Sequence, residues 1–234
     1  MFLDFFKKMP EAWQQIDWFP LWLSLRVASI ATAISLAVGL TLAYLLARYR
    51  FRGREVLDSL ITLPIVLPPT VLGYYLLVLL GRNTPLGRAF EAVFGFPLVF
   101  TWQAAVLAAA FHSIPLLVKS ARAALESVDH TIENAARTLG ASEWRVFFQV
   151  TLPLSRRSIL AATVFAFARA LGDFGVTIMI AGNIPGKTQT AAVAIYDAVQ
   201  SGNTLLANLM VLIISVVAVG ILYWTNRLQE GRFS

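Results

Sequence analysis

The chain has 234 residues, of which 58% are hydrophobic and only 14% carry a charge. This composition excludes an ordinary water-soluble domain and an intrinsically disordered chain, and it predicts a protein that lies in a lipid bilayer. The absence of cysteine excludes disulfide scaffolds and cysteine nucleophiles, and His112 and His130 alone cannot make a metal site. The net charge of +6 could indicate nucleic-acid binding or the orientation of a membrane protein, and the positions of the basic residues decide between them.

Membrane-spanning segments account for most of the chain. A spanning helix needs about 20 apolar residues, and we expect such helices at about 27–47, 59–80, 98–118, 158–182 and 203–225. The fold class is therefore all-α integral membrane. The spans define a transmembrane domain at 27–226, with an outer segment at 1–26, a long loop at 119–157 and a tail at 227–234. No cleavable signal peptide is evident, so the first span is expected to direct insertion.

The lysines and arginines between the spans predict the orientation of the protein in the membrane. Twelve lie on one side: Arg48, Arg50, Arg52, Arg54, Lys119, Arg122, Arg137, Arg145, Arg156, Arg157, Arg227 and Arg232. Five lie on the other: Lys7, Lys8, Arg82, Arg88 and Lys187. Because cytoplasmic loops are rich in basic residues, we expect the N-terminus outside and the C-terminus in the cytoplasm. The positive charge thus indicates topology and not nucleic-acid binding.

The first span carries small residues at every fourth position, which places them on one helical face. These residues are Ala31, Ser35, Gly39, Ala43 and Ala47. Small residues allow two membrane helices to approach closely. We therefore expect this face to pack against another helix.

The second span contains Pro64, Pro68 and Pro69, which lack three amide donors within six residues. The helix must kink or break there, because carbonyls one turn earlier lose their partners. Broken backbone at membrane depth is tolerated only inside protein or beside a watery cavity. The sequence favours a segment that lines a transport pathway, and the alternative is a kink without transport significance.

The fourth span contains Arg169 and Asp173, four residues apart on one predicted helical face. Charges at membrane depth are costly, so the two residues are expected to pair or to face a polar interior. Two roles remain open, a structural lock or an attraction of anions by Arg169. Gly172 and Gly175 permit a break or a close backbone approach. Thr177 adds a neutral hydroxyl that could contact a passing anion without holding it tightly.

The segment 119–157 has a helical pattern of its own. A small-faced helix is expected to end at Gly140, and a short amphipathic helix at 142–150 is expected to stop before Pro153. Glu133 and Arg137 form a favourable pair four residues apart. An exposed turn lined by small residues, followed by an aromatic-rich helix, is typical of a segment that fits a groove in a soluble partner.

Residues in this segment resemble the EAA loop of bacterial ABC importer permeases. The resemblance lies in Glu133-Asn134-Ala135-Ala136-Arg137-Thr138-Leu139-Gly140 and, nine residues later, in Val150-Thr151-Leu152-Pro153. Asn134 stands at the glutamate position of the motif, with Glu133 one place earlier, and Val150 stands at its isoleucine position. The resemblance implies ATPase coupling by Glu133, Ala135, Ala136, Arg137, Gly140, Trp144, Arg145, Leu152 and Pro153. It implies a translocation pathway that includes Pro64, Pro68, Pro69, Arg169, Asp173 and Thr177.

The resemblance covers the chain from the first to the fifth span and is strongest to molybdate permeases of that family. It rests on 51–54, 63–69, 167–175 and 183–188, with Asp173 where relatives often carry glutamate. It implies a five-span permease fold with a cytoplasmic coupling helix, in the bacterial cytoplasmic (inner) membrane. The implied partners are a second copy, a cytoplasmic ABC ATPase dimer and an extracytoplasmic molybdate-binding protein.

The chain contains no Gly-x-x-x-x-Gly-Lys-Ser/Thr phosphate loop. ATP and Mg would therefore be used by the partner, and this chain is expected to be non-catalytic and to bind no cofactor. Tungstate and sulfate or thiosulfate remain alternative substrates. A passive anion channel is a further alternative, although it does not explain the helical pattern of the segment 119–157. A membrane-embedded enzyme would need more than His112 as its imidazole.

Overall fold

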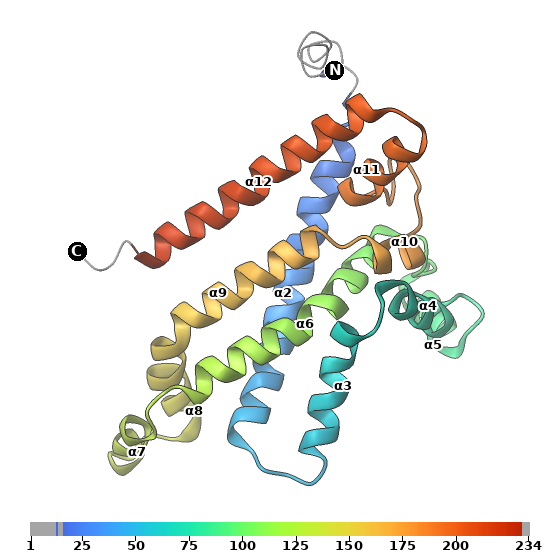
Figure 1. Cartoon of the computed structure of the whole chain (residues 1–234). Coiled ribbons are helices and arrows are strands. Elements are labelled where there is room, and N and C mark those ends of the chain that lie inside the picture. Colours follow the sequence, from blue (N-terminus) through green and yellow to red (C-terminus); the bar gives the residue numbers. More distant parts are fainter. Residues whose placement is uncertain (1–12, 14–15, 231–234) are drawn as a thin grey trace.

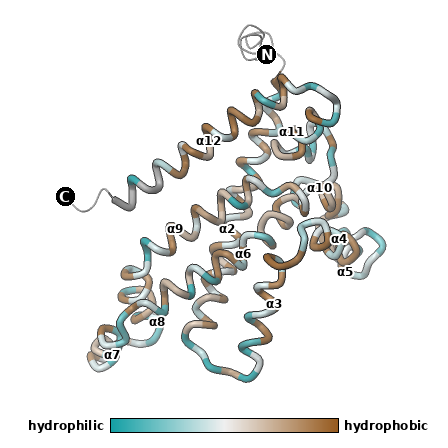
Figure 2. The backbone as a smooth tube through the Cα atoms, viewed as in Figure 1, coloured by the Kyte–Doolittle hydropathy of each residue, from teal (hydrophilic) through white to brown (hydrophobic). Residues whose placement is uncertain are grey.

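The computed structural model describes residue 13 and residues 16–230, and this part is helical throughout, without a strand (Figure 1). In chain order it contains α2 (Phe19–Arg48), α3 (Arg54–Val66), α4 (Pro69–Leu80), α5 (Pro85–Phe94), α6 (Trp102–Glu126), α7 (His130–Thr138), α8 (Glu143–Val146), the π-helical turn η1 (Phe147–Thr151), α9 (Leu152–Leu171), α10 (Gly175–Ala181), α11 (Ala191–Gln200) and α12 (Thr204–Glu230). Among the described residues, four helices are long and apolar enough to cross a membrane, and the bent pair α3–α4 makes a fifth span if it is counted as one. Figure 2 shows hydrophobic residues along α3 and α12 and hydrophilic residues around α7.

The small-residue face of α2 packs against α6, as predicted. Ala31, Ser35 and Ala43 are completely buried, and the Ser35 hydroxyl donates a hydrogen bond to the carbonyl of Ala110 at 3.4 Å. A Cβ at Gly39 would lie 2.7 Å from Leu117 Cδ2, so a larger residue there would force the buried Leu117 side chain to shift. The close contact makes α2 and α6 the central pair of the fold.

The proline-rich segment breaks the second span, also as predicted. Leu67 is extended, with ψ 140°, because the following proline disfavours the helical conformation. Pro68 and Pro69 donate no hydrogen bond, so α4 starts as a separate helix and the two axes differ by 114°. α4 then packs on α10, where a Cβ at Gly175 would lie 2.7 Å from Pro69 Cβ.

The fourth span differs from the expected helix at 158–182. One continuous helix runs from Glu143 to Leu171 through α8, η1 and α9. It ends at Leu171, and residues 172–174 form a break before α10. Arg169 and Asp173 consequently do not share one helix, although the backbone N–H of Asp173 still bonds to the Ala170 carbonyl at 3.3 Å.

Other helix boundaries also correct the expected spans. α2 begins at Phe19, so the expected outer segment at 1–26 includes its first turns. Residues 1–12 and 14–15 of that segment lie outside the described residues. α12 continues to Glu230, into the expected tail, of which 231–234 lie outside the described residues.

The third span is displaced toward the C-terminus from the expected 98–118. The Thr101 hydroxyl accepts a hydrogen bond from the Ala104 amide and sets the start of α6 at Trp102. The helix continues into the expected loop because its polar last turns are ion-paired. Lys119 lies 2.8 Å from Asp58, while Arg122 and Glu126 make a 2.9 Å contact one turn apart.

Candidate coupling loop and membrane polar cluster

The segment 129–148, here called the elbow, consists of α7, a turn at Gly140, α8 and the first two residues of η1. Asp129 caps α7 by accepting a hydrogen bond from the Thr131 amide at 2.8 Å. This bond lowers the pKa of Asp129 below its usual value. α7 ends where Gly140 adopts φ 85°, a left-handed conformation that glycine tolerates best. Ser142 then caps α8, so the chain reverses within a few residues.

An ion pair fixes α7 relative to α8. The Arg137 guanidinium donates to both carboxylate oxygens of Glu143, at 2.7 and 3.0 Å. These bonds lower the pKa of Glu143 and raise that of Arg137. Arg137 also donates to the Asn134 side-chain oxygen at 2.8 Å. The elbow is therefore held in one shape by polar contacts near its surface.

The elbow presents apolar side chains to its surroundings. Leu139 is 88% exposed and Trp144 is 69% exposed. The Trp144 ring stacks on Phe148, with centroids 6.1 Å apart. Exposed apolar surface rimmed by polar groups is typical of a protein contact site.

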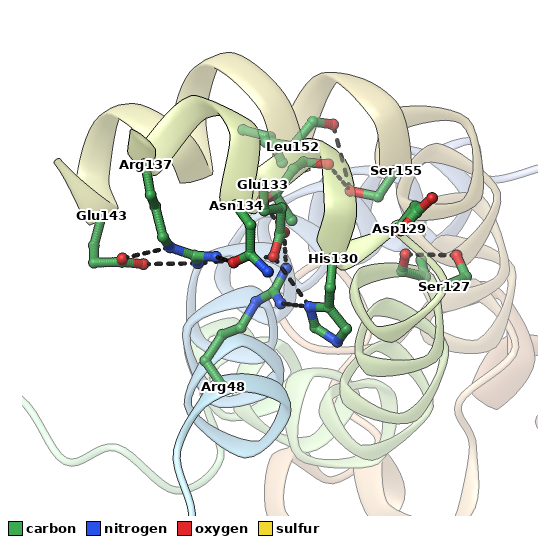
Figure 3. A network of polar contacts seen from close by, with 12 residues as sticks. Arg48, Ser127, Asp129, His130, Glu133, Asn134, Arg137, Glu143, Leu152 and Ser155 are labelled. Carbon is green, nitrogen blue, oxygen red and sulfur yellow. Dashed lines mark hydrogen bonds and ion pairs between the residues drawn. The ribbon is translucent and has the colours of Figure 1, made fainter. Parts of the chain in front are cut away.

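The predicted coupling residues divide between the surface and the interior. Ala135, Gly140, Trp144, Arg145 and Pro153 are exposed, and Ala136, Arg137 and Leu152 are half-buried. Glu133, by contrast, is 0% exposed. It accepts a hydrogen bond from Thr151 Oγ1 at 2.6 Å and forms an ion pair with Arg48 at the end of α2 (Figure 3). The sequence pattern did not indicate these two partners.

A second group of polar residues lies where α6, α9 and α10 meet, and we call it the polar cluster. It comprises His112, Arg169, Asp173 and Thr177. Asp173 is 3% exposed, and its oxygens accept the Thr177 amide at 3.1 Å and hydroxyl at 2.7 Å. His112 Nδ1 lies 3.0 Å from the same carboxylate. The buried acid is thus surrounded by donors, as a buried charge requires.

Arg169 is the most accessible member of the polar cluster. Its side chain is 31% exposed and lies 3.7 Å from Asp173, so the predicted pair does form. One of its nitrogens lies 2.6 Å from ring nitrogens of His112. The sequence patterns predicted no contact between His112 and Arg169. A pattern in the sequence could have predicted that His112 is buried. Ala105, Ala108 and Ala109 precede it at helical spacing and form the buried face of α6.

The break in the second span lies near the polar cluster. Pro69 packs against Gly175, which stands between Asp173 and Thr177 in the chain. Pro68 and Pro69 are exposed in the single chain, and Pro64 is half-buried within α3. The structure therefore brings Pro69 close to the polar cluster and places Pro64 farther along the bent pair.

The arrangement of spans and elbow defines the class of the protein. It is the fold of the membrane-spanning subunits of ABC importers. The chain aligns with an inward-facing structure of the MetNI methionine ABC transporter at TM-score 0.72 and 16% identity, over 91% of this chain and 94% of that one. It aligns with a bacterial ABC transporter involved in alginate import at TM-score 0.71 and 16% identity, over 92% and 79% of the two chains.

Residues 35–233 match the family described as the binding-protein-dependent transport system inner membrane component, and the chain belongs to this family of multi-pass membrane proteins. It is 46% identical over 220 residues to the molybdenum transport system permease protein ModB of Escherichia coli, covering 92% of this chain and 96% of that protein. It is 41% identical over 208 residues to the putative molybdenum permease YvgM of Bacillus subtilis, covering 89% and 92%. The sulfate permease CysT of Escherichia coli is 37% identical over 208 residues, covering 89% and 74%.

Proposed function

We propose that this chain is the permease subunit of an ATP-driven molybdate importer in the bacterial inner membrane. The observation that carries the proposal is the exposed elbow on a chain that matches molybdate permeases over nearly its whole length. The sulfate permease CysT is less similar and is matched over less of its own length. Molybdate is therefore favoured over sulfate as the transported oxyanion, and tungstate, which is nearly alike in size and charge, is the second candidate.

The proposed assembly contains two copies of this chain, a cytoplasmic ATPase dimer and an extracytoplasmic molybdate-binding protein. The elbow faces the cytoplasm in this proposal, because α2, α3 and α6 also carry arginines at that end, including Arg48, Arg54 and Arg122. The N-terminus then lies outside and the C-terminus inside. The chain itself is non-catalytic, and the partner uses ATP and Mg.

The exposed surface of the elbow acts by docking to the ATPase in this scheme. Leu139 and Trp144 supply the apolar contact, and Gly140 permits the tight turn between the two short helices. Closure of the ATPase dimer on ATP displaces the elbow and moves the spans from an inward-facing to an outward-facing state. Hydrolysis reverses the change. ATP acts only through its different affinity for the two states of the complex.

The polar cluster and the broken second span supply the proposed pathway. Arg169 is partly exposed while Asp173 balances its charge, so the guanidinium can contact an oxyanion without binding it tightly. Thr177 supports Asp173, Pro68 and Pro69 keep the nearby backbone in its broken form, and Pro64 lies farther along the pathway within α3. The second copy of the chain would complete the pathway.

Reconstitution in liposomes tests this function. The complex of permease, ATPase and molybdate-loaded binding protein is expected to accumulate molybdate only when ATP is present. Sulfate-loaded and tungstate-loaded binding proteins, each in its own reaction, identify the transported anion. Molybdate flux through the permease alone, without ATPase or ATP, would support the channel alternative and overturn the proposal.

A further inference from the structure

The glutamate of α7 faces the interior of the chain and not the docking surface. Glu133 is the buried residue of α7, while its neighbours Ile132 and Asn134 are exposed. Asn134 is also the residue at the glutamate position of the EAA motif. A partner that approaches the elbow therefore meets Asn134, and Glu133 serves the permease itself.

Glu133 connects three separate parts of the chain (Figure 3). Its Oε1 atom contacts Arg48 at the end of α2 and accepts the hydroxyl of Thr151 in η1 at 2.6 Å. Its Oε2 atom lies 3.3 Å from His130 Nδ1 and 3.8 Å from the Arg137 guanidinium, both on α7. The residues at 48, 133 and 151 are distant in the sequence, so these contacts join elements that the backbone does not join directly.

This joint is polar because α7 has no apolar anchor among its described residues. Glu133 is the buried side chain of the helix, and α7 otherwise exposes Ile132 and Ala135. A buried carboxylate must keep its donors, since an unpaired buried charge is costly. The contacts of this carboxylate therefore position α7 on α2 and η1, together with the 3.4 Å contact between Arg48 and His130.

The π-helical turn contributes directly to the joint. η1 covers Phe147–Thr151 and inserts one wide turn between α8 and α9. Thr151 is 2% exposed and directs its hydroxyl to Glu133. π-helical turns of this kind occur frequently at functional sites. The other end of the joint, Arg48, belongs to α2. This helix packs closely on α6, which carries His112.

We propose that Arg48, Glu133 and Thr151 form a brace that carries the displacement of the elbow into α2 and α9 together. The inference rests on the proposed transport function and assigns these three side chains as positioning residues. With the brace intact, the elbow and the ends of both helices move as one body. Without it, the exposed elbow surface still binds the ATPase, but ATP hydrolysis no longer moves the spans effectively.

The first experiment measures transport and ATP hydrolysis by the complete complex in liposomes. Glu133→Gln keeps the size of the side chain and leaves Arg48 without its ion-pair partner. We expect molybdate transported per ATP to fall about tenfold, in the range of typical coupling between sites, while ATPase co-purification stays within about twofold of wild type. Glu126→Gln is the matched control, because it removes an acid paired with Arg122 at the end of α6, outside the elbow.

Thr151→Val provides a second variant that creates no unpaired charge. It removes one hydrogen bond at nearly constant volume, and we expect about a threefold loss of transport per ATP from the loss of that single bond. If Glu133→Gln lowers the yield of folded complex, the transport ratio of Thr151→Val tests the brace instead. A wild-type transport ratio in both variants, or loss of ATPase binding in both, overturns the brace. Absence of molybdate transport by the wild-type complex instead overturns the proposed function.

A distance measurement tests the rigid connection itself. The chain has no cysteine, so spin labels can be attached to Thr131→Cys on α7 and Tyr49→Cys after α2, both at exposed positions. In the wild-type background, ATP is expected to leave the distance between the labels unchanged, because α7 and the end of α2 move together. In Glu133→Gln the distance distribution is expected to broaden. Identical distributions in the two backgrounds overturn the proposal.

Discussion

Gly140→Ala separates the backbone requirement of the elbow from its side-chain contacts. Gly140 has φ 85°, and a Cβ placed there meets nothing within 4 Å. The substitution therefore introduces no clash, and its cost comes from the left-handed conformation, about 1–2 kcal/mol for an L-residue. The adjacent bonds, Gly140 N–H to Arg137 O at 2.9 Å and Ala141 N–H to Ala136 O at 3.1 Å, require that conformation.

This cost predicts a loss of ATPase affinity. A free elbow can relax to another conformation, whereas a docked elbow must keep the one described, so binding is weakened by the cost of restoring the turn. At 1.4 kcal/mol per factor of ten, the dissociation constant should rise about 5–30-fold. The measurement is a binding titration of the purified ATPase against the detergent-solubilised permease.

Gly53→Ala is the matched control for this prediction. Gly53 has φ 89°, and a Cβ there also meets nothing within 4 Å, but it lies in the turn between α2 and α3 and outside the elbow. The backbone cost is the same, and ATPase affinity should stay within about twofold of wild type. Equal affinities for Gly140→Ala and wild type, or equal losses for both variants, would refute the reasoning.

Three other substitutions test the pathway, the helix packing and the docking surface. Arg169→Ala should lower molybdate transport about tenfold or more, whereas Arg82→Ala, which removes an exposed partner of Glu91, should change it less than about twofold; equal rates would remove Arg169 from the pathway. Gly39→Leu should destabilise the protein by about 3 kcal/mol, because the completely buried Leu117 lies against this position. Gly220→Leu is the control and should not destabilise it, because the space around Gly220 is open. The melting temperatures of the two variants in detergent test this prediction. Trp144→Ala should weaken ATPase binding about tenfold without affecting membrane insertion, and wild-type co-purification would contradict the docking role.

Local patterns in the sequence predicted those parts of the fold that local physics determines. The small residues from Ala31 to Ala43 mark the packed face of α2, because four-residue spacing fixes one side of a helix. The prolines at 68 and 69 mark the break, because they lack amide donors at any place in a fold. Neither conclusion required knowledge of the partner helix.

The polar contacts between distant segments were not predictable in the same way. His112 and Asp173 lie 61 positions apart, and nothing near either residue indicates the other. Glu133 belongs to a motif that suggested a partner contact, yet its helix is turned so that the carboxylate points inward. Which face of a nine-residue helix is buried depends on how α2 and η1 approach it. The span boundaries at Phe19 and Leu171 likewise depended on caps and breaks that hydropathy does not report.

The unbroken helix from Glu143 to Leu171 determines how motion at the elbow reaches the membrane. Its 29 residues extend over roughly 43 Å at 1.5 Å per residue, which exceeds the hydrocarbon thickness of about 30 Å. The helix is therefore longer than the hydrocarbon layer is thick, and its C-terminal end lies beside Asp173. No flexible linker intervenes between α8 and α9, so in the proposed scheme a shift of the Trp144 end reaches Arg169 along this helix, while the Arg48–Glu133–Thr151 brace couples α7 and α2 to the same displacement.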